Sequence, residues 1–199
     1  FWILILNRAN KVYRKERISE GGVAGTVVDI KIVFKKALEY GVTTLELDVV
    51  ISKDNQIVVS HEPWMNHAIC TQPNGAEITE ETAKDFNLYQ LTYEQIKAFD
   101  CGIKGNPKFP EQDSIKTFKP TLRMVVEAIN AQLNDQKRTI FYNIETKTNP
   151  EMDSVFHPAP QEFVELLYTE LKALKIVEQA TVQSFDPRTL QVLHKLDST

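Results

Sequence analysis

Short apolar runs alternate with amphipathic stretches along the chain, which is the pattern of strands that are each followed by a helix. Continuous apolar runs rich in branched side chains predict buried strands, at residues 1–6, 42–52, 57–61, 138–147 and 179–186. Apolar positions at helical spacing predict helices, at residues 27–41, 91–100, 121–133, 158–176 and 186–196. Strands that alternate with helices favour an α/β protein with a parallel sheet, whose chemistry lies at the carboxyl ends of the strands.

Helix-capping residues support two of these helices. Thr92 and Gln95 fit a capping box at the start of the short helix. Asp186 and Pro187 fit the N-cap and first position of the last helix. Residues 10–25, by contrast, have mixed charge and several glycines, and they predict a loop.

Composition places the chain among ordinary globular proteins. Its 199 residues are 42% hydrophobic and 25% charged, which is enough for one domain with a core. A net charge of −4 without a basic run argues against nucleic acid as the main partner. The apolar start is too short for a transmembrane segment, and it predicts a first strand in preference to the tail of a signal peptide.

The cysteines leave two states open. Cys70 and Cys101 are compatible with one disulfide in an oxidising compartment or with two buried thiols. No CxxC motif is present, so their spacing predicts no zinc site. A secreted or periplasmic location is slightly favoured over a cytoplasmic one, and an oligomer is compatible with the sequence.

Paired charges near the ends of two predicted strands indicate a metal site. Residues two apart on a strand share a face, so Glu46 lies beside Asp48, and Glu145 lies beside Lys147. Adjacent carboxylates repel one another and lose hydration, and a hard divalent cation resolves both problems. Three such carboxylates suit Mg²⁺ or Ca²⁺, and the turn at 53–56 returns the chain to bring His61 nearby.

Each of these short patterns also has an ordinary structural explanation. A Glu-x-Asp pair on a strand is more often a solvated edge or an ion-pair partner than a metal site, and a single histidine is more often structural than catalytic. His67, His157 and His194 are assigned to structural roles for that reason. What favours a site is the joint placement of the other residues at strand ends, where an anionic phosphate could meet a cation, a lysine and a histidine.

The segment from Phe34 to Trp64, with its E-x-D-V, K-D-N and V-V-S-H-E motifs, resembles the glycerophosphodiester phosphodiesterase family. The later "YNIETK", "KPTL" and "VQSFD" stretches are also similar to that family. The resemblance implies a TIM-type (β/α) barrel, apparently incomplete in this chain, forming a single domain over 1–199 with a lid-like insertion at about 62–118.

The same resemblance implies the chemistry and the residue roles. The family hydrolyses glycerophosphodiesters to an alcohol and glycerol 3-phosphate with a divalent cation, Mg²⁺ or Ca²⁺. It assigns Glu46, Asp48 and Glu145 to the metal, and it makes His61 one of two acid–base histidines. Lys147 would lie near the phosphate, and Arg8 would add positive charge there.

The beginning of the chain departs from the family pattern. Asn7 stands where the first catalytic histidine is expected, and asparagine cannot shuttle a proton near neutral pH. The sequence therefore predicts reduced activity. It leaves two alternatives: a non-catalytic module that binds phosphate and metal, and a lyase similar to phosphatidylinositol phospholipases.

Overall fold

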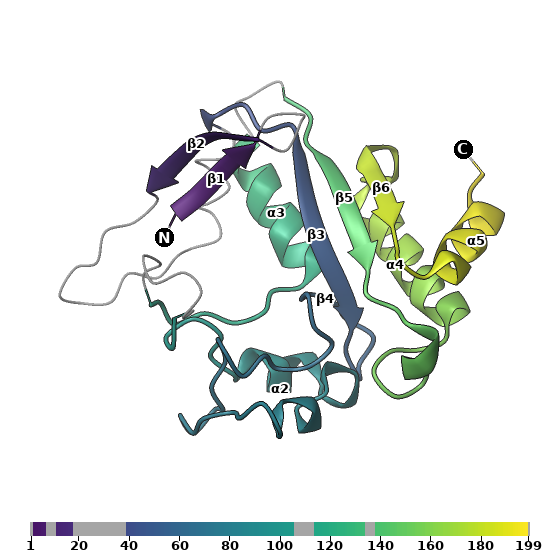
Figure 1. The fold of residues 1–199 in the computed structure, drawn as a ribbon. Helices are drawn as coiled ribbons and strands as arrows, with labels where there is room; N and C mark the ends of the chain where they lie inside the picture. Colours follow the sequence, from purple (N-terminus) through teal and green to yellow (C-terminus); the bar gives the residue numbers. More distant parts are fainter. Residues whose placement is uncertain (1, 7–10, 18–38, 106–113, 134–137, 199) are drawn as a thin grey trace.

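The computed structural model describes residues 2–6, 11–17, 39–105, 114–133 and 138–198. At its centre lies a four-stranded sheet with the order β4–β3–β5–β6 (Figure 1). The strands are β3 (Thr44–Ile51), β4 (Ile57–Val59), β5 (Phe141–Thr146) and β6 (Ala180–Gln183). β3, β5 and β6 run parallel, whereas β4 returns antiparallel to β3. The predicted α/β architecture with a parallel sheet is confirmed.

The helices begin and end close to the predicted positions. They are α2 (Tyr93–Lys97), α3 (Leu122–Leu133), α4 (Pro160–Leu174) and α5 (Pro187–Leu196). Short 3₁₀ helices form η1 (Ala83–Asp85), η2 (Leu88–Gln90), η3 (Pro150–Met152) and η4 (Val177–Gln179). Both predicted caps are confirmed: Thr92 and Gln95 form a capping box, and the Asp186 side chain accepts the Arg188 backbone N–H.

The two faces of the sheet differ in chemistry because side chains alternate along each strand. One face packs its apolar side chains against α3 and α4 in the main core, through Leu47, Val49, Ile51, Tyr142 and Ile144. The opposite face presents polar side chains towards the carboxyl ends of the strands. In register, Asp48 pairs with Glu145, and Glu145 pairs with Gln183 on β6.

The described part of residues 62–118 lies at the carboxyl end of β3 (Figure 1). It has a second core, which packs on Val50 and Val58 of the sheet and includes Met65, Cys70, Ile78, Leu88, Ile96 and Phe99. Cys70 and Cys101 form a disulfide within this segment, which decides between the two predicted states. The Asn87 side chain donates to the Val155 carbonyl at 2.7 Å, which fastens the segment to the loop after β5.

The N-terminal strand does not lie where the sequence predicted. β1 (Trp2–Leu6) pairs antiparallel with β2 (Val12–Arg17) in a separate two-stranded sheet (Figure 1). The prediction of a first parallel strand of the main sheet is therefore wrong, and so is the predicted loop over residues 12–17; residues 10 and 18–25 of that loop lie outside the described residues. The reason is that a short apolar run is equally compatible with one strand of an antiparallel hairpin. Most of the helix predicted at 27–41 lies outside the described residues.

Within the ranges that the model describes, no helix has the length and apolar character needed to cross a membrane.

Candidate active site

Three carboxylates from two neighbouring strands meet at the polar face of the sheet. Glu46, Asp48 and Glu145 each present an oxygen, and these oxygens all lie within 4.8 Å of one another. We call these three residues the acidic cluster. Its members differ in exposure: Glu145 is buried, Asp48 is half-buried and Glu46 is exposed. The strand register produces this arrangement, because Asp48 and Glu145 are direct partners on adjacent parallel strands.

Lys147 partly compensates the charge of the acidic cluster. Its Nζ donates to Glu145 Oε1 at 2.6 Å and lies 3.5 Å from Asp48 Oδ1. Burial alone would lower the pKa of Lys147, but the hydrogen bond to Glu145 and the charge of Asp48 raise it overall. Lys147 therefore stays protonated as part of the cluster, yet one cation among three carboxylates leaves an excess of negative charge.

The pKa of Glu46 is raised by its surroundings in the cluster. Desolvation raises the pKa of Glu46, and the charges of Asp48 and Glu145 raise it further. Lys147 and His61 act in the opposite direction but do not reverse the shift. A group that binds its proton more tightly because of its neighbours lies in a site that would gain from a cation.

His61 reaches the edge of the cluster through the β3–β4 hairpin. The turn between the strands contains Asn55 in the left-handed region at φ 61°. The Ser60 backbone N–H then donates to the Asp48 carbonyl at 3.0 Å, so the chain returns alongside β3 and the next residue, His61, follows a residue bonded to Asp48. Its side chain is 68% exposed, and Nδ1 lies 3.2 Å from Glu62 Oε1. The ring is therefore accessible to a ligand at the cluster.

Two amide side chains complete the polar face, and sequence reasoning gave them no role. Gln183 donates from Nε2 to Glu46 Oε1 at 3.3 Å and to Glu145 Oε2 at 3.4 Å. Asn143 in turn donates to Gln183 Oε1 at 3.2 Å. The signal that could have identified them is register, since they lie on the carboxylate face of the neighbouring strands.

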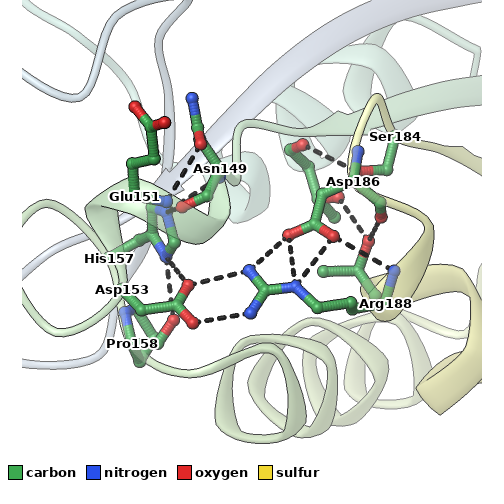
Figure 2. A network of polar contacts seen from close by, with 10 residues as sticks. Asn149, Glu151, Asp153, His157, Pro158, Ser184, Asp186 and Arg188 are labelled. Carbon is green, nitrogen blue, oxygen red and sulfur yellow. Dashed lines mark hydrogen bonds and ion pairs between the residues drawn. The ribbon is translucent and has the colours of Figure 1, made fainter.

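A second group of charges comes from the loops that follow β5 and β6 and from the first turn of α5. We call Asp153, His157, Asp186 and Arg188 the arginine network (Figure 2). Arg188 donates to both oxygens of Asp153, at 2.7 and 2.9 Å, and to both oxygens of Asp186. These hydrogen bonds lower the pKa of both carboxyl groups. The network fastens the two loops together.

His157 belongs to this network and not to the acidic cluster. It is fully buried, and its Nε2 accepts the Asn149 backbone N–H at 3.0 Å. Its Nδ1 lies 2.9 Å from the Pro158 carbonyl and donates to it (Figure 2). Both ring nitrogens thus have backbone partners, as the predicted structural role of His157 requires.

The residues of the acidic cluster fit a hard divalent cation. All three donors are carboxylate oxygens from strands whose positions are fixed by the sheet, and oxygen donors of this kind suit Mg²⁺ and Ca²⁺. The predicted set of Glu46, Asp48, Glu145, Lys147 and His61 is brought together. Arg8 lies outside the described residues, so its role stays a prediction.

Comparison with known proteins divides the chain into two parts that overlap. The model of the glycerophosphoryl diester phosphodiesterase family matches residues 33–199, and that of the RadC-like JAB domain matches residues 1–47. A UPF0758 protein of Flavobacterium johnsoniae is 55% identical over 47 residues, 24% of this chain and 20% of that protein. Asn7 and Arg8 precede residue 33, where the phosphodiesterase match begins, so that model does not support placing Asn7 at a catalytic histidine.

The remainder of the chain is similar to phosphodiesterases. A glycerophosphodiester phosphodiesterase of Caldanaerobacter subterraneus subsp. tengcongensis is 31% identical over 163 residues, 82% of this chain and 54% of that protein. A candidate glycerophosphoryl diester phosphodiesterase of Silicibacter pomeroyi has a similar structure, with a TM-score of 0.69 and 22% identity. That match covers 83% of this chain and 55% of the other.

A phosphodiesterase of Oleispira antarctica, solved with the product sn-glycerol-3-phosphate, gives a TM-score of 0.57 at 17% identity, over 84% of this chain and 56% of that one. The chain thus spans about half the length of the relatives it matches. Its sheet is part of the TIM-type barrel fold predicted from the sequence, and the family model covers most of its residues. The chain belongs to the glycerophosphoryl diester phosphodiesterase family.

Proposed function

We propose that the acidic cluster binds one divalent cation, Mg²⁺ or Ca²⁺, in the catalytic centre of a phosphodiesterase. The substrate class is a glycerophosphodiester, and the products are an alcohol and glycerol 3-phosphate. The observation that supports this most is the convergence of three carboxylates and only one lysine at the ends of adjacent parallel strands. The names of the relatives support the reaction class, and sn-glycerol-3-phosphate is the product in the Oleispira structure.

The residues of the chain have separate tasks in this proposal. A cation held by Glu46, Asp48 and Glu145 supplies positive charge for the phosphate oxygens. Lys147 holds the side chains of Glu145 and Asp48 in place, and its ammonium group offers a further donor to an anion. His61, exposed at the edge of the cluster, exchanges a proton with the attacking water or the leaving alcohol.

Only one acid–base histidine is available in this proposal. All four histidines of the chain lie in its described part, and His157 is buried with both nitrogens bonded to the backbone. His61 is the one tied to the cluster by the hydrogen bond from Ser60 to Asp48. Hydrolysis of an ester with a poor leaving group would therefore be slow, because the loss of one acid–base partner typically costs about 10²- to 10⁴-fold in rate.

The test compares two substrates with and without added Mg²⁺ or Ca²⁺. We expect cation-dependent hydrolysis of an activated aryl phosphodiester, and slower release of glycerol 3-phosphate from glycerophosphocholine. Cation binding without turnover of either substrate would support the alternative of a non-catalytic binding module, which the single histidine favours. A cyclic phosphate as the final product would support the lyase alternative.

We also propose a secreted or periplasmic location in preference to the cytoplasm. The disulfide between Cys70 and Cys101, 31 residues apart, supports this because such bonds persist in oxidising compartments. Thiol counting on the protein purified from its native host tests the proposal. Two free thiols per chain would argue for a reducing compartment.

The part of residues 62–118 that the model describes supports a role as a lid over the strand ends. Trp64 is half-buried, with its ring 5.4 Å from that of Phe156 and with Lys84 lying over it. These contacts indicate that Trp64 packs within the protein and does not contact substrate. We propose that this segment also contributes to the choice of substrate, which is tested by shortening it and comparing substrate preference.

A further inference from the structure

A buried lysine lies next to the residue that carries the proposed proton transfer, and it has no part in the proposed mechanism. Lys119 precedes Pro120 in the "KPTL" stretch, and only 8% of its surface is exposed. Its Nζ donates to the Ser60 hydroxyl at 2.8 Å. A buried ammonium group is costly unless it forms such bonds, so its presence here calls for a functional explanation.

The Ser60 hydroxyl links Lys119 to the backbone on the far side of His61. Because the hydroxyl accepts from Lys119, its own hydrogen is free to point elsewhere, and it donates to the Glu62 carbonyl at 2.6 Å. The Ser60 backbone N–H is bonded to the Asp48 carbonyl at 3.0 Å. The backbone on both sides of His61 is thus fixed, on one side to a residue of the acidic cluster and on the other through a serine held by the lysine.

The lysine itself is anchored independently of this link. Val59 donates its backbone N–H to the Pro120 carbonyl at 2.8 Å, and the Tyr93 hydroxyl lies 3.3 Å from the Lys119 carbonyl. The backbone that carries Lys119 therefore runs beside β4 and cannot shift without moving the strand. Burial lowers the pKa of Lys119 to about 8, while the charge of Glu62 opposes the shift.

We propose that Lys119 is a positioning residue, which holds His61 in its catalytic orientation through the Ser60 hydroxyl. The inference rests on the proposed function, because it assumes that His61 transfers a proton and must be held in place to do so. Proton transfer is sensitive to placement at this scale, and a displacement of about 1 Å can cost on the order of 100-fold in rate. Lys119 touches neither the cluster nor the substrate in this proposal, and it acts only through Ser60.

The test compares Lys119→Met, which keeps the shape of the side chain but removes the donor, with Lys119→Arg, which keeps a donor. Lys97→Met is the matched control, because Lys97 is an exposed lysine that lies over Phe118. We expect Lys119→Met to lower kcat by about 10- to 100-fold, with KM and cation affinity unchanged. We expect Lys119→Arg to restore most of the rate, and Ser60→Ala to reproduce the loss. Equal kcat values for Lys119→Met and Lys97→Met would overturn the proposal.

A second measurement separates this inference from the proposed function. In NMR spectra of the imidazole groups, Lys119→Met should shift the His61 signals and leave those of His157 and His194 in place. This readout does not require turnover, so it decides the positioning role even if the protein hydrolyses neither substrate. Unchanged His61 signals in a folded Lys119→Met protein would contradict the proposal, and so would equal shifts of all the histidines.

Discussion

The acidic cluster on β3 and β5 and the arginine network, which follows β5 and β6, illustrate opposite uses of charge. In the arginine network, each carboxyl group has a guanidinium partner, and the pKa of Asp153 and of Asp186 is lowered. In the acidic cluster, three carboxylates share one lysine, and the pKa of Glu46 is raised. The charges of the first arrangement are paired within the protein, whereas the second would gain from a cation. The predictions below test this difference.

The two histidines associated with these groups should differ most clearly. His61→Gln should lower the rate of glycerophosphocholine hydrolysis by about 10²- to 10⁴-fold, since it removes the acid–base group. Cation affinity and thermal stability should not change, because the side chain is exposed. His157→Gln is the comparison, since it removes a buried ring that links Asn149 with Pro158. It should lower the Tm, and loss of Tm in His61→Gln with no loss of rate would contradict the assignment.

Asp186→Ala should cause the largest loss of stability. Asp186 is buried, caps α5 and accepts hydrogen bonds from Arg188. Loss of an N-cap alone costs about 1 kcal/mol, and the loss of the guanidinium contacts adds to it. Urea unfolding measures the change. Asp186→Asn keeps the cap but removes the charge, so it should cost less than Asp186→Ala; an equal cost would show that the cap contributes nothing.

Glu46→Gln should have the opposite sign in the absence of a cation. It removes one of three carboxylates that repel one another. The free energy of unfolding should therefore rise by about a few tenths of a kcal/mol, with a slight rise in Tm. Added Ca²⁺ should stabilise the parent protein but stabilise Glu46→Gln much less, because binding stabilises the folded state in proportion to affinity. Thermal unfolding with and without Ca²⁺ measures both effects. A clear loss of stability without a cation would indicate that the cluster is structural.

The pH dependence should separate the two groups without any mutation. The pKa of Glu46 is raised above 4.5, so protons begin to compete with the cation before the pH falls to that value. The affinity for the cation should therefore fall as the pH is lowered towards 4.5, and further below it. The pKa of Asp153 and of Asp186 is lowered, so their contribution to stability is present above an unfolded value of about 3.9. It is lost only as the pH falls through their folded values, below 3.8.

Calorimetric titration between about pH 7 and about pH 4.5, together with thermal unfolding at lower pH, measures the two ranges. Cation affinity that stays constant to about pH 4 would show that the Glu46 carboxylate is not a ligand.

Features that follow from local sequence patterns could be predicted, whereas contacts between residues far apart in the sequence could not. The acidic cluster followed from a strand period of two and from parallel strands that end at one edge, so Glu46, Asp48 and Glu145 were found. Gln183 and Asn143 carry no charge, and their role depends on the strand register, which the sequence does not state. The contact between Arg188 in α5 and Asp153 in the loop after β5 joins residues 35 apart, and local patterns do not determine such pairs.

The N-terminal segment shows a different limit. Its apolar run satisfied the pattern of a buried strand, but pairing partners depend on what lies elsewhere in the fold. β1 pairs with β2, and residues 1–47 match the model of another family, which overlaps the phosphodiesterase match at residues 33–47. The absence of a histidine at Asn7 is therefore a property of a segment outside the phosphodiesterase match, which begins at residue 33.

The most direct test of the account is isothermal titration calorimetry with Mg²⁺ and Ca²⁺ on the parent chain and on two matched variants. Glu145→Gln removes the buried carboxylate of the acidic cluster, and Asp153→Asn removes a carboxylate of the arginine network. We predict that the parent binds one cation per chain, that Asp153→Asn binds it equally well, and that Glu145→Gln loses about 100-fold or more in affinity. Absence of binding by the parent would contradict the account, as would equal affinity of the parent and Glu145→Gln.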